Sequence, residues 1–182
     1  NLDVVCPYPP DDTAEHHLEA YLADLPTTAA GYDLVVIDAP PMLGPRPTAL
    51  LRAAGEVLVV LRAEPMAVRT LPAYLALVKQ VRASGGRCRL LGVLVTAAPG
   101  QPVDGPEVAA VLAAVPKAVA GVVPFDPVAG RALLHGVPLV TLDPASPAAR
   151  AYLALADAIG VASVAVAADP PEPVVVRPAA SP

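Results

Sequence analysis

Aromatic residues are scarce in this chain of 182 residues, which has no tryptophan, one phenylalanine and five tyrosines. Hydrophobic residues still make up 55% of the sequence, so the core has to be built from leucine, valine and alanine. Such side chains suit helices that pack closely on a sheet. The length predicts one domain that is large enough to bury a real core.

Cysteine is almost absent as well. Cys6 and Cys88 lie in apolar, strand-like runs without the spacing of metal ligands, which predicts buried free thiols. No apolar run reaches the length of a transmembrane helix, and no signal peptide is visible. We therefore expect a cytoplasmic protein. The chain begins at Asn1 with residues that already resemble a strand, so an upstream part is expected to be missing.

Basic residues are outnumbered by acidic ones, and the net charge of -5 argues against a general nucleic-acid binder. Half of the twelve basic residues nevertheless fall between positions 62 and 89. Four of them form the candidate patch for DNA, an acidic lipid surface or an acidic partner: Lys79, Arg82, Arg87 and Arg89. The alternative is that this patch is the solvated face of one helix.

The sequence YDLVVIDAPP at residues 32–41 combines a β-branched apolar run with an aspartate and two prolines. This pattern predicts a strand at 33–38 that is buried on both faces of a parallel sheet. Proline cannot extend a central strand, so Pro40 and Pro41 turn the chain into a loop. Asp38 would then lie at the carboxyl end of the strand, where open α/β sheets bind ligands, and it could hold a metal ion. The alternative is that Asp38 caps the next turn.

Strand-like and helix-like segments alternate along the chain. Further strands are expected at 2–6, 56–61, 88–96 and 119–123, helices at 11–25, 48–54, 67–84, 106–115, 127–135 and 147–159, and an extended piece at 139–142. Pro72 is awkward inside a helix, so the third helix is expected to begin near Thr70. The alternation predicts an α/β fold: a parallel sheet with helices on both faces.

Two proline-led helices carry clear start signals, because Asp126 precedes Pro127 and Ser146 precedes Pro147. Residues 161–182 are rich in alanine, valine and proline, which predicts a mobile tail with at most one edge strand at 161–166. The expected organisation is thus one α/β domain at 1–160 and a tail at 161–182.

Three stretches resemble the ParA/MinD-type ATPases, the P-loop proteins of the SIMIBI class with a deviant Walker A motif. YDLVVIDAPPMLG resembles their Walker B strand and loop, and EVLVVLRAEPMAVRTL resembles the strand and helix that follow. The third stretch, VPFDPVAGRALLHGVPLVTLDPASPAARAYLALADAI, resembles their carboxyl-terminal region and is the most specific. The resemblance covers residues 1–160 and implies a three-layer P-loop NTPase (Rossmann-like) fold that is incomplete at its amino terminus.

The resemblance implies a nucleotide site. Asp38 matches the Walker B aspartate, which helps hold Mg²⁺ through water, and Pro40 lies in the loop after it. Pro124, Phe125 and Asp126 match the loop near the base and ribose. ATP and Mg²⁺ are expected only if residues upstream of this chain complete the site. In this family ATP lies between two subunits, so a homodimer or a ParA-like partner is also implied.

The chain departs from the family in lacking the KGGxGK[ST] loop, which would lie upstream of every residue here. Gly85-Gly86 leads into a strand through Arg87, which is the wrong context for a phosphate cradle. Phosphoryl transfer needs cradling amides, a lysine and Mg²⁺ together. We therefore assign no catalytic residues and expect no hydrolysis by this chain alone.

Three functions remain open at this point. The first is a partitioning or positioning ATPase seen without its Walker A motif, and the second is a P-loop-less partner or adaptor protein. The third is a tyrosine-kinase-like domain of polysaccharide export, against which the five tyrosines without a carboxyl-terminal cluster argue. A sheet without its first strand–helix unit would expose apolar surface, which dimerisation or swapping could cover.

Overall fold

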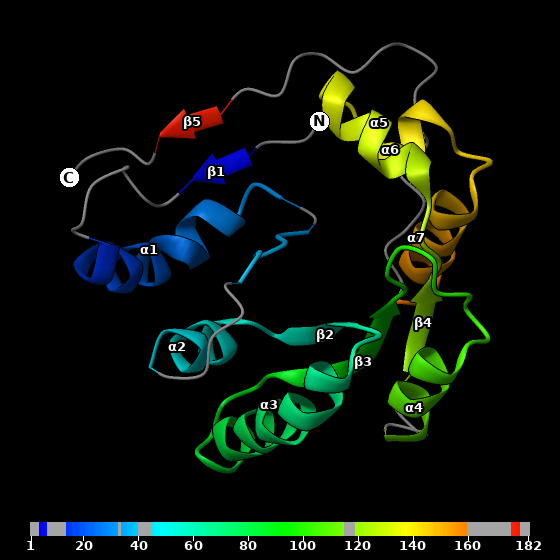
Figure 1. Cartoon of the computed structure of the whole chain (residues 1–182). Helices are drawn as coiled ribbons and strands as arrows, with labels where there is room; N and C mark the ends of the chain where they lie inside the picture. Colours follow the sequence, from blue (N-terminus) through cyan, green and yellow to red (C-terminus); the bar gives the residue numbers. More distant parts are fainter. Residues whose placement is uncertain are drawn as a thin grey trace.

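A parallel sheet of β2 (Glu56–Arg62), β3 (Arg89–Thr96) and β4 (Val119–Val123), in this order, is the centre of the computed structural model (Figure 1). The structure describes residues 4–6, 14–32, 34–39, 45–114, 119–159 and 176–178. Its helices are α1 (Ala14–Ala29), α2 (Pro45–Ala53), α3 (Pro65–Ala83), α4 (Pro106–Ala114), α5 (Pro127–His135), α6 (Leu139–Leu142) and α7 (Pro147–Ala158).

The sheet is buried between two helical layers, which confirms the three-layer α/β prediction. On one face Leu61, Val93 and Val95 form the main core with apolar residues of α3 and α4. On the other face Leu94 and Val123 contact α7 through Ala148 and Leu155. Because every strand runs parallel to its neighbour, the carboxyl ends of all three lie at one edge.

Helix α3 begins earlier than the sequence predicts. Glu64 is the N-cap and Pro65 takes the first position, so Pro72 lies inside the helix and a start near Thr70 is wrong. The helix tolerates Pro72, which is exposed, because Leu71 and Val78 on its other face are buried against the sheet. The predicted end is confirmed, since Ser84 is the C-cap and Gly85 follows in the left-handed region with φ 90°.

Two further predictions are corrected. The expected extended piece at 139–142 is the short helix α6, because the N–H groups of Thr141 and Leu142 both donate to the carbonyl of Pro138 at 3.0 Å. The expected central strand at 33–38 is also wrong over the described residues 34–39, which form an irregular segment without regular secondary structure. A strand needs a ladder partner, and among the described residues this segment has none.

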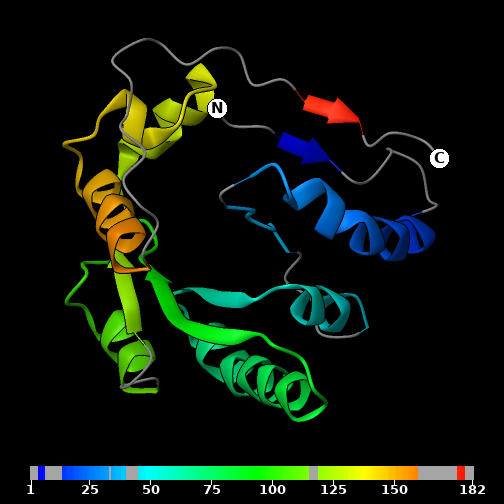
Figure 2. The same ribbon diagram turned by 180° about the vertical axis from the view of Figure 1, so that it is seen from behind.

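A second, two-stranded parallel sheet joins β1 (Val4–Cys6) to β5 (Val176–Pro178). Figures 1 and 2 show this pair beside α1 and apart from the main sheet. Residues 176–178 of the predicted tail are therefore a strand, whereas the predicted edge strand at 161–166 lies outside the described residues. The division into a domain at 1–160 and a tail at 161–182 stays a prediction.

Candidate nucleotide site

A candidate site is a cavity of about 340 Å³ at the carboxyl ends of β3 and β4. Its wall is mostly apolar and comes from both strand ends, from the first turns of α5 and from α6 and α7. The lining residues are Thr96, Ala97, Val123, Pro124, Phe125, Asp126, Pro127, Ala129, Gly130, Leu139, Ala148 and Tyr152. The structure thus brings together three residues that the sequence predicts near a base: Pro124, Phe125 and Asp126.

Asp126 holds the cavity wall together. Its Oδ1 accepts a hydrogen bond from the backbone N–H of Val128 at 2.9 Å, which caps α5 as predicted. Its Oδ2 accepts from the N–H of Ala148 at 3.3 Å in the first turn of α7. These amide donors and the nearby Ser146 and Arg131 lower the pKa of Asp126, with the Val128 amide as the largest cause. Both oxygens therefore already serve the fold, and the predicted nucleotide contact of Asp126 stays a prediction.

Two aromatic rings border the cavity. Phe125 is 46% exposed and Tyr152, on α7, is 41% exposed. An exposed ring beside a cavity offers a stacking surface to a flat heteroaromatic group. Tyr152 was not predicted from the sequence, where the only signal is an aromatic residue in the second turn of a helix that begins at a capping serine.

Next to the cavity wall at Thr96 and Ala97 lies a set of polar contacts around Gln101 that the sequence did not reveal. Gln101 accepts from the N–H of Ala98 at 2.8 Å and donates from Nε2 to the carbonyl of Ala63 at 3.0 Å. The hydroxyl of Thr96 donates to the carbonyl of Leu61 at 3.3 Å. These bonds join the ends of β2 and β3, so the cavity wall at Thr96 and Ala97 is held in place.

Asp38 does not line this cavity. It is exposed in the irregular segment 34–39, and no group of three or more potential metal-ligating side chains occurs among the residues described. Pro40 lies outside the described residues. The described residues therefore offer an apolar cavity bordered by two rings, and among them no cluster of carboxylates stands ready for a Mg²⁺ ion.

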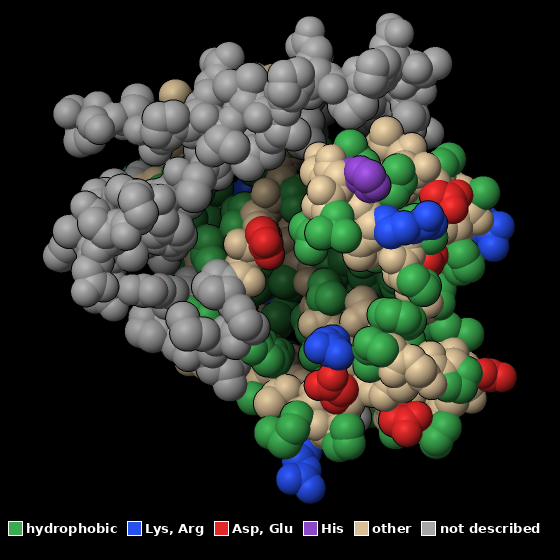
Figure 3. Space-filling view, turned by 45° about the horizontal axis from the view of Figure 1, so that its top comes forward, with side chains coloured by type: hydrophobic (Ala, Val, Ile, Leu, Met, Phe, Trp, Pro, Cys, Tyr) green, Lys and Arg blue, Asp and Glu red, His purple; other side chains and the backbone are tan. Residues whose placement is uncertain are grey.

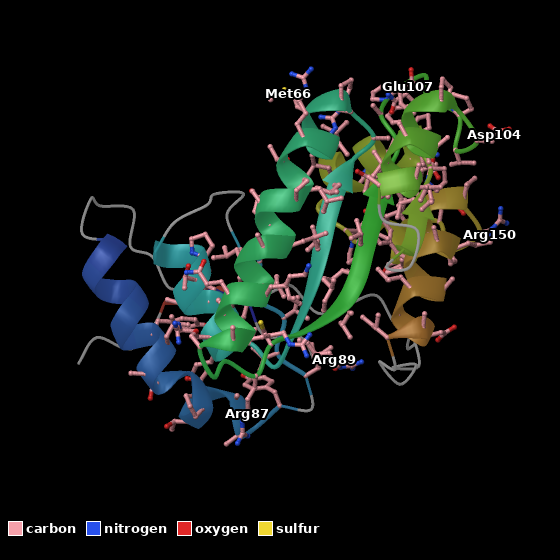
Figure 4. The ribbon with its side chains drawn as sticks, turned by 90° about the horizontal axis from the view of Figure 1, so that it is seen from below. Met66, Arg87, Arg89, Asp104, Glu107 and Arg150 are labelled. Carbon is pink, nitrogen blue, oxygen red and sulfur yellow. The ribbon has the colours of Figure 1, made fainter. Side chains whose placement is uncertain are left out.

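The candidate basic patch lies at the other end of the sheet. Figure 4 shows Arg87 and Arg89 at one end of the sheet. Met66 and Glu107 lie at the opposite end, where the strands finish. All four patch residues are exposed, but the guanidinium of Arg89 is ion-paired with Glu56. Lys79, Arg82 and Arg87 thus supply most of the charge that a partner could meet.

Outside the candidate basic patch, several large apolar side chains are exposed, whereas basic side chains do not gather on the face shown in Figure 3. Figure 3 shows Lys and Arg scattered among acidic and hydrophobic side chains on the face that it presents. The most exposed large apolar side chains are Leu134 at 86%, Leu133 at 82% and Val36 at 80%. No described helix combines the length and the apolar character that crossing a bilayer requires.

A second hollow of about 280 Å³ lies between the first turns of α3 and α4. Its wall includes Glu64, Arg69 and Glu107, and Glu64 is already ion-paired with Arg62 at 3.0 Å. Two carboxylates and one guanidinium give it no preference for an anion. We therefore place the candidate nucleotide site at the larger cavity.

Known proteins resemble this chain in both sequence and fold. No protein-family model matches it. The chromosome-partitioning ATPase Soj from Thermus thermophilus is 38% identical over 132 residues, which are 71% of this chain and 53% of Soj.

Solved structures of MinD and McdA share the fold. The septum site-determining protein MinD from Pyrococcus horikoshii, in complex with Mg-ADP, is 26% identical with a TM-score of 0.62, over 80% of this chain and 59% of that one. MinD from Pyrococcus furiosus is 25% identical with a TM-score of 0.61, over 80% and 60%. McdA from Cyanthece, at 22% identity and a TM-score of 0.65 over 81% and 64%, supports the fold alone. The chain belongs to the ParA/MinD-type P-loop ATPases, and it spans about half the length of Soj, the curated relative that it matches.

Proposed function

We propose that this chain is the carboxyl-side part of a partitioning or positioning ATPase and that its cavity holds the adenine base. The observation that carries the proposal is the 38% identity to the chromosome-partitioning ATPase Soj. The cavity at the carboxyl ends of β3 and β4 supports it, since open α/β sheets bind ligands at this edge.

Each residue of the cavity has a limited task in this proposal. Phe125 and Tyr152 would stack on the base, Pro124 would restrict the loop, and Asp126 would keep α5 and α7 in position. Bound ATP would supply the phosphoanhydride bond, and Asp38 would reach its Mg²⁺ through water. The loop that cradles the phosphates is not in these 182 residues, so this chain binds the base and does not hydrolyse ATP by itself.

The base site can be tested by filling the cavity. A Cβ at Gly130 meets nothing within 4 Å, so Gly130→Trp can place a large ring against the cavity without a backbone clash. Millimolar ATP should shift the amide signals of residues 96–97 and 125–126 in the wild type and much less in this variant. Leu133→Trp is the matched control, because it lies on the same helix, is 82% exposed and does not line the cavity. Equal shifts in both variants would remove the base from this cavity.

The missing phosphate cradle predicts weak binding. We expect a dissociation constant for Mg-ATP on the order of 1 mM or weaker, which corresponds to about -4 kcal/mol. Isothermal titration of the chain with Mg-ATP measures it. Micromolar affinity would mean that residues of this chain do bind the phosphates, and the assignment would then be wrong.

A non-catalytic partner or adaptor is the second candidate, because the same absence of a Walker A loop would suit a subunit that pairs with a complete ParA-like protein. Sequencing the reading frame upstream of Asn1 separates the two candidates. A KGGxGK[ST] motif in frame eliminates the adaptor, and a stop codon eliminates the ATPase. The similarity to Soj and MinD favours both over the tyrosine-kinase-like domain.

In this proposal, a role in DNA partition would depend on the candidate basic patch. We expect Arg82→Glu combined with Arg87→Glu to weaken binding to non-specific duplex DNA or to anionic vesicles, with a smaller salt dependence. Arg69→Glu is the control, since Arg69 lies on α3 at the other end of the helix. Binding that is unchanged in the double variant would make these residues the solvated face of α3. Homodimer formation and a cytoplasmic location stay predictions.

A further inference from the structure

The wall of the larger cavity offers a base more ring surface than hydrogen-bonding groups. Of its described lining residues, only Thr96, Asp126 and Tyr152 carry a polar side chain. The hydroxyl of Thr96 donates to the carbonyl of Leu61 at 3.3 Å, and the two oxygens of Asp126 accept from backbone amides at 2.9 and 3.3 Å. Two of the three polar side chains are therefore already engaged within the protein.

The backbone of this wall is engaged in the same way. The N–H of Ala97 donates to the carbonyl of Val123 at 2.9 Å, and the N–H of Ala129 donates to the carbonyl of Asp126 at 3.1 Å. Pro124 and Pro127 have no N–H to offer. The strand pairing, the helix cap and the two prolines thus leave few backbone donors along the described wall.

We propose that this site binds purine nucleotides without distinguishing adenine from guanine, an inference that rests on the proposed base site. The rings of Phe125 and Tyr152 border the cavity, and stacking on an aromatic ring accepts every base because every base has a π-face. A spare lone pair on Asp126 would not discriminate either, since adenine and guanine each carry an amino group that can donate to it.

The expected selectivity is small for a physical reason. A site that is built to hydrogen-bond its substrate rejects an analogue without the matching group by on the order of 10⁴-fold. A site that depends on stacking responds to ring size instead, and the two purines present the same bicyclic ring. We therefore expect the dissociation constants of ATP and GTP to lie within about threefold of each other. UTP should bind more weakly, because its single ring covers less of Phe125 and Tyr152.

Amide chemical-shift titrations of the full chain with Mg-ATP, Mg-GTP and Mg-UTP test this expectation. The signals of residues 96–97 and 125–126 report binding in the cavity, and their concentration dependence gives each dissociation constant. Phe125→Leu and Tyr152→Leu should each weaken ATP and GTP by a similar factor, because each removes a stacking surface that both bases use. Leu133→Ala is the matched control and should change neither affinity, since Leu133 lies on α5, is 82% exposed and does not line the cavity.

Tyr152→Phe isolates the third polar side chain of the wall. This variant keeps the ring and removes only the hydroxyl, so the ratio of the ATP and GTP affinities should stay the same. A ratio that changes by more than about threefold would mean that the hydroxyl reads the base, and the proposal would be wrong.

The outcomes separate this inference from the base site on which it rests. A preference for either purine above about tenfold overturns the inference and leaves the base site in place. Shifts with UTP as strong as those with ATP mean that the sugar and phosphates, and not the base, produce the binding, and they overturn both. No shift with any nucleotide also overturns both. Circular dichroism of each variant checks that a loss of binding does not come from a loss of the fold.

Discussion

Two segments of nearly the same composition behave differently in this molecule. Residues 56–62 and residues 34–39 are both apolar, β-branched runs that end near a charged side chain. The first is β2, which pairs with β3 over its whole length and contributes Leu61 to the core. The second has no ladder among the described residues and leaves Val36 80% exposed. Strand-like sequence therefore becomes a strand only where a partner edge is available.

The contrast extends to the regions around them. Every buried residue of the three core clusters lies between residues 61 and 155. Helix α1 contributes none of the described buried residues, and the segment after it is largely exposed. Stability should thus come from residues 56–159, and changes in residues 21–39 should matter little to the monomer.

The largest expected effect is the loss of a core leucine. Leu71 on α3 is 1% exposed in the main core, so Leu71→Ala should lower the free energy of unfolding by about 2–5 kcal/mol. Leu34→Ala, at 54% exposure, should change it by less than about 0.5 kcal/mol. Urea unfolding at concentrations where the protein is monomeric measures both. Equal losses would mean that the segment 34–39 is packed in solution and would break the comparison.

The second largest effect on stability is expected at a proline inside a helix of the packed region. Pro72 lies inside α3 and cannot donate a backbone hydrogen bond there, so Pro72→Ala should stabilise the protein by up to about 3 kcal/mol. Pro65 occupies the first helical position, where proline fits, and Pro65→Ala should be nearly neutral. Thermal unfolding of the two variants distinguishes them. A destabilised Pro72→Ala would show that the ring itself is needed for the path of α3.

A smaller effect is expected at a helix cap. The hydroxyl of Ser146 accepts from the N–H of Ala149 at 3.3 Å and caps α7 beside the cavity, so Ser146→Ala should cost about 1 kcal/mol. Ser146→Thr should recover most of this loss, since threonine also caps well and adds no charge beside Asp126. Thr28→Ala removes an exposed hydrogen bond to Asp24 in α1 and should cost less than about 0.5 kcal/mol. Chemical denaturation of all three variants tests whether caps matter more in the packed region.

Most of the fold could be predicted from the sequence, because most of its helices and strands depend on signals in the local sequence. Asp126 and Ser146 cap the helices that they were expected to cap, and Cys88 is a buried free thiol as expected. The failures occurred where distant partners decide the outcome. The strand at 33–38 required a neighbour that local sequence cannot supply, and Pro72 is tolerated because α3 packs on a sheet formed by residues far along the chain.

The site could be predicted only in part, because some of its residues follow from local sequence and others are brought there by distant packing. The loop after β4 was identified from its resemblance to the family; Pro124 and Phe125 line a cavity in the structure, and their contact with a base stays a prediction. Tyr152 and the polar contacts around Gln101 come from other parts of the chain, and only the packing of α7 and the ends of β2 and β3 brings them there. Asp38 does not line this cavity, and among the described residues its segment has no ladder partner.

The smallest expected effect is the pH dependence that Asp126 gives to the packed region. Its pKa in the folded state lies below the value of 3.8 that it has in the unfolded chain, so its carboxylate stabilises the fold above about pH 3.8. This contribution is lost as the pH falls through the lower, folded-state pKa. Asp126→Asn carries no titrating group, so its free energy of unfolding should fall less steeply than that of the wild type between about pH 5 and pH 2.5. Urea titrations across this range compare the two slopes. Equal slopes would mean that the amides of Val128 and Ala148 bind the ionised and protonated carboxyl groups alike, and that Asp126 joins α5 to α7 through geometry and not through charge.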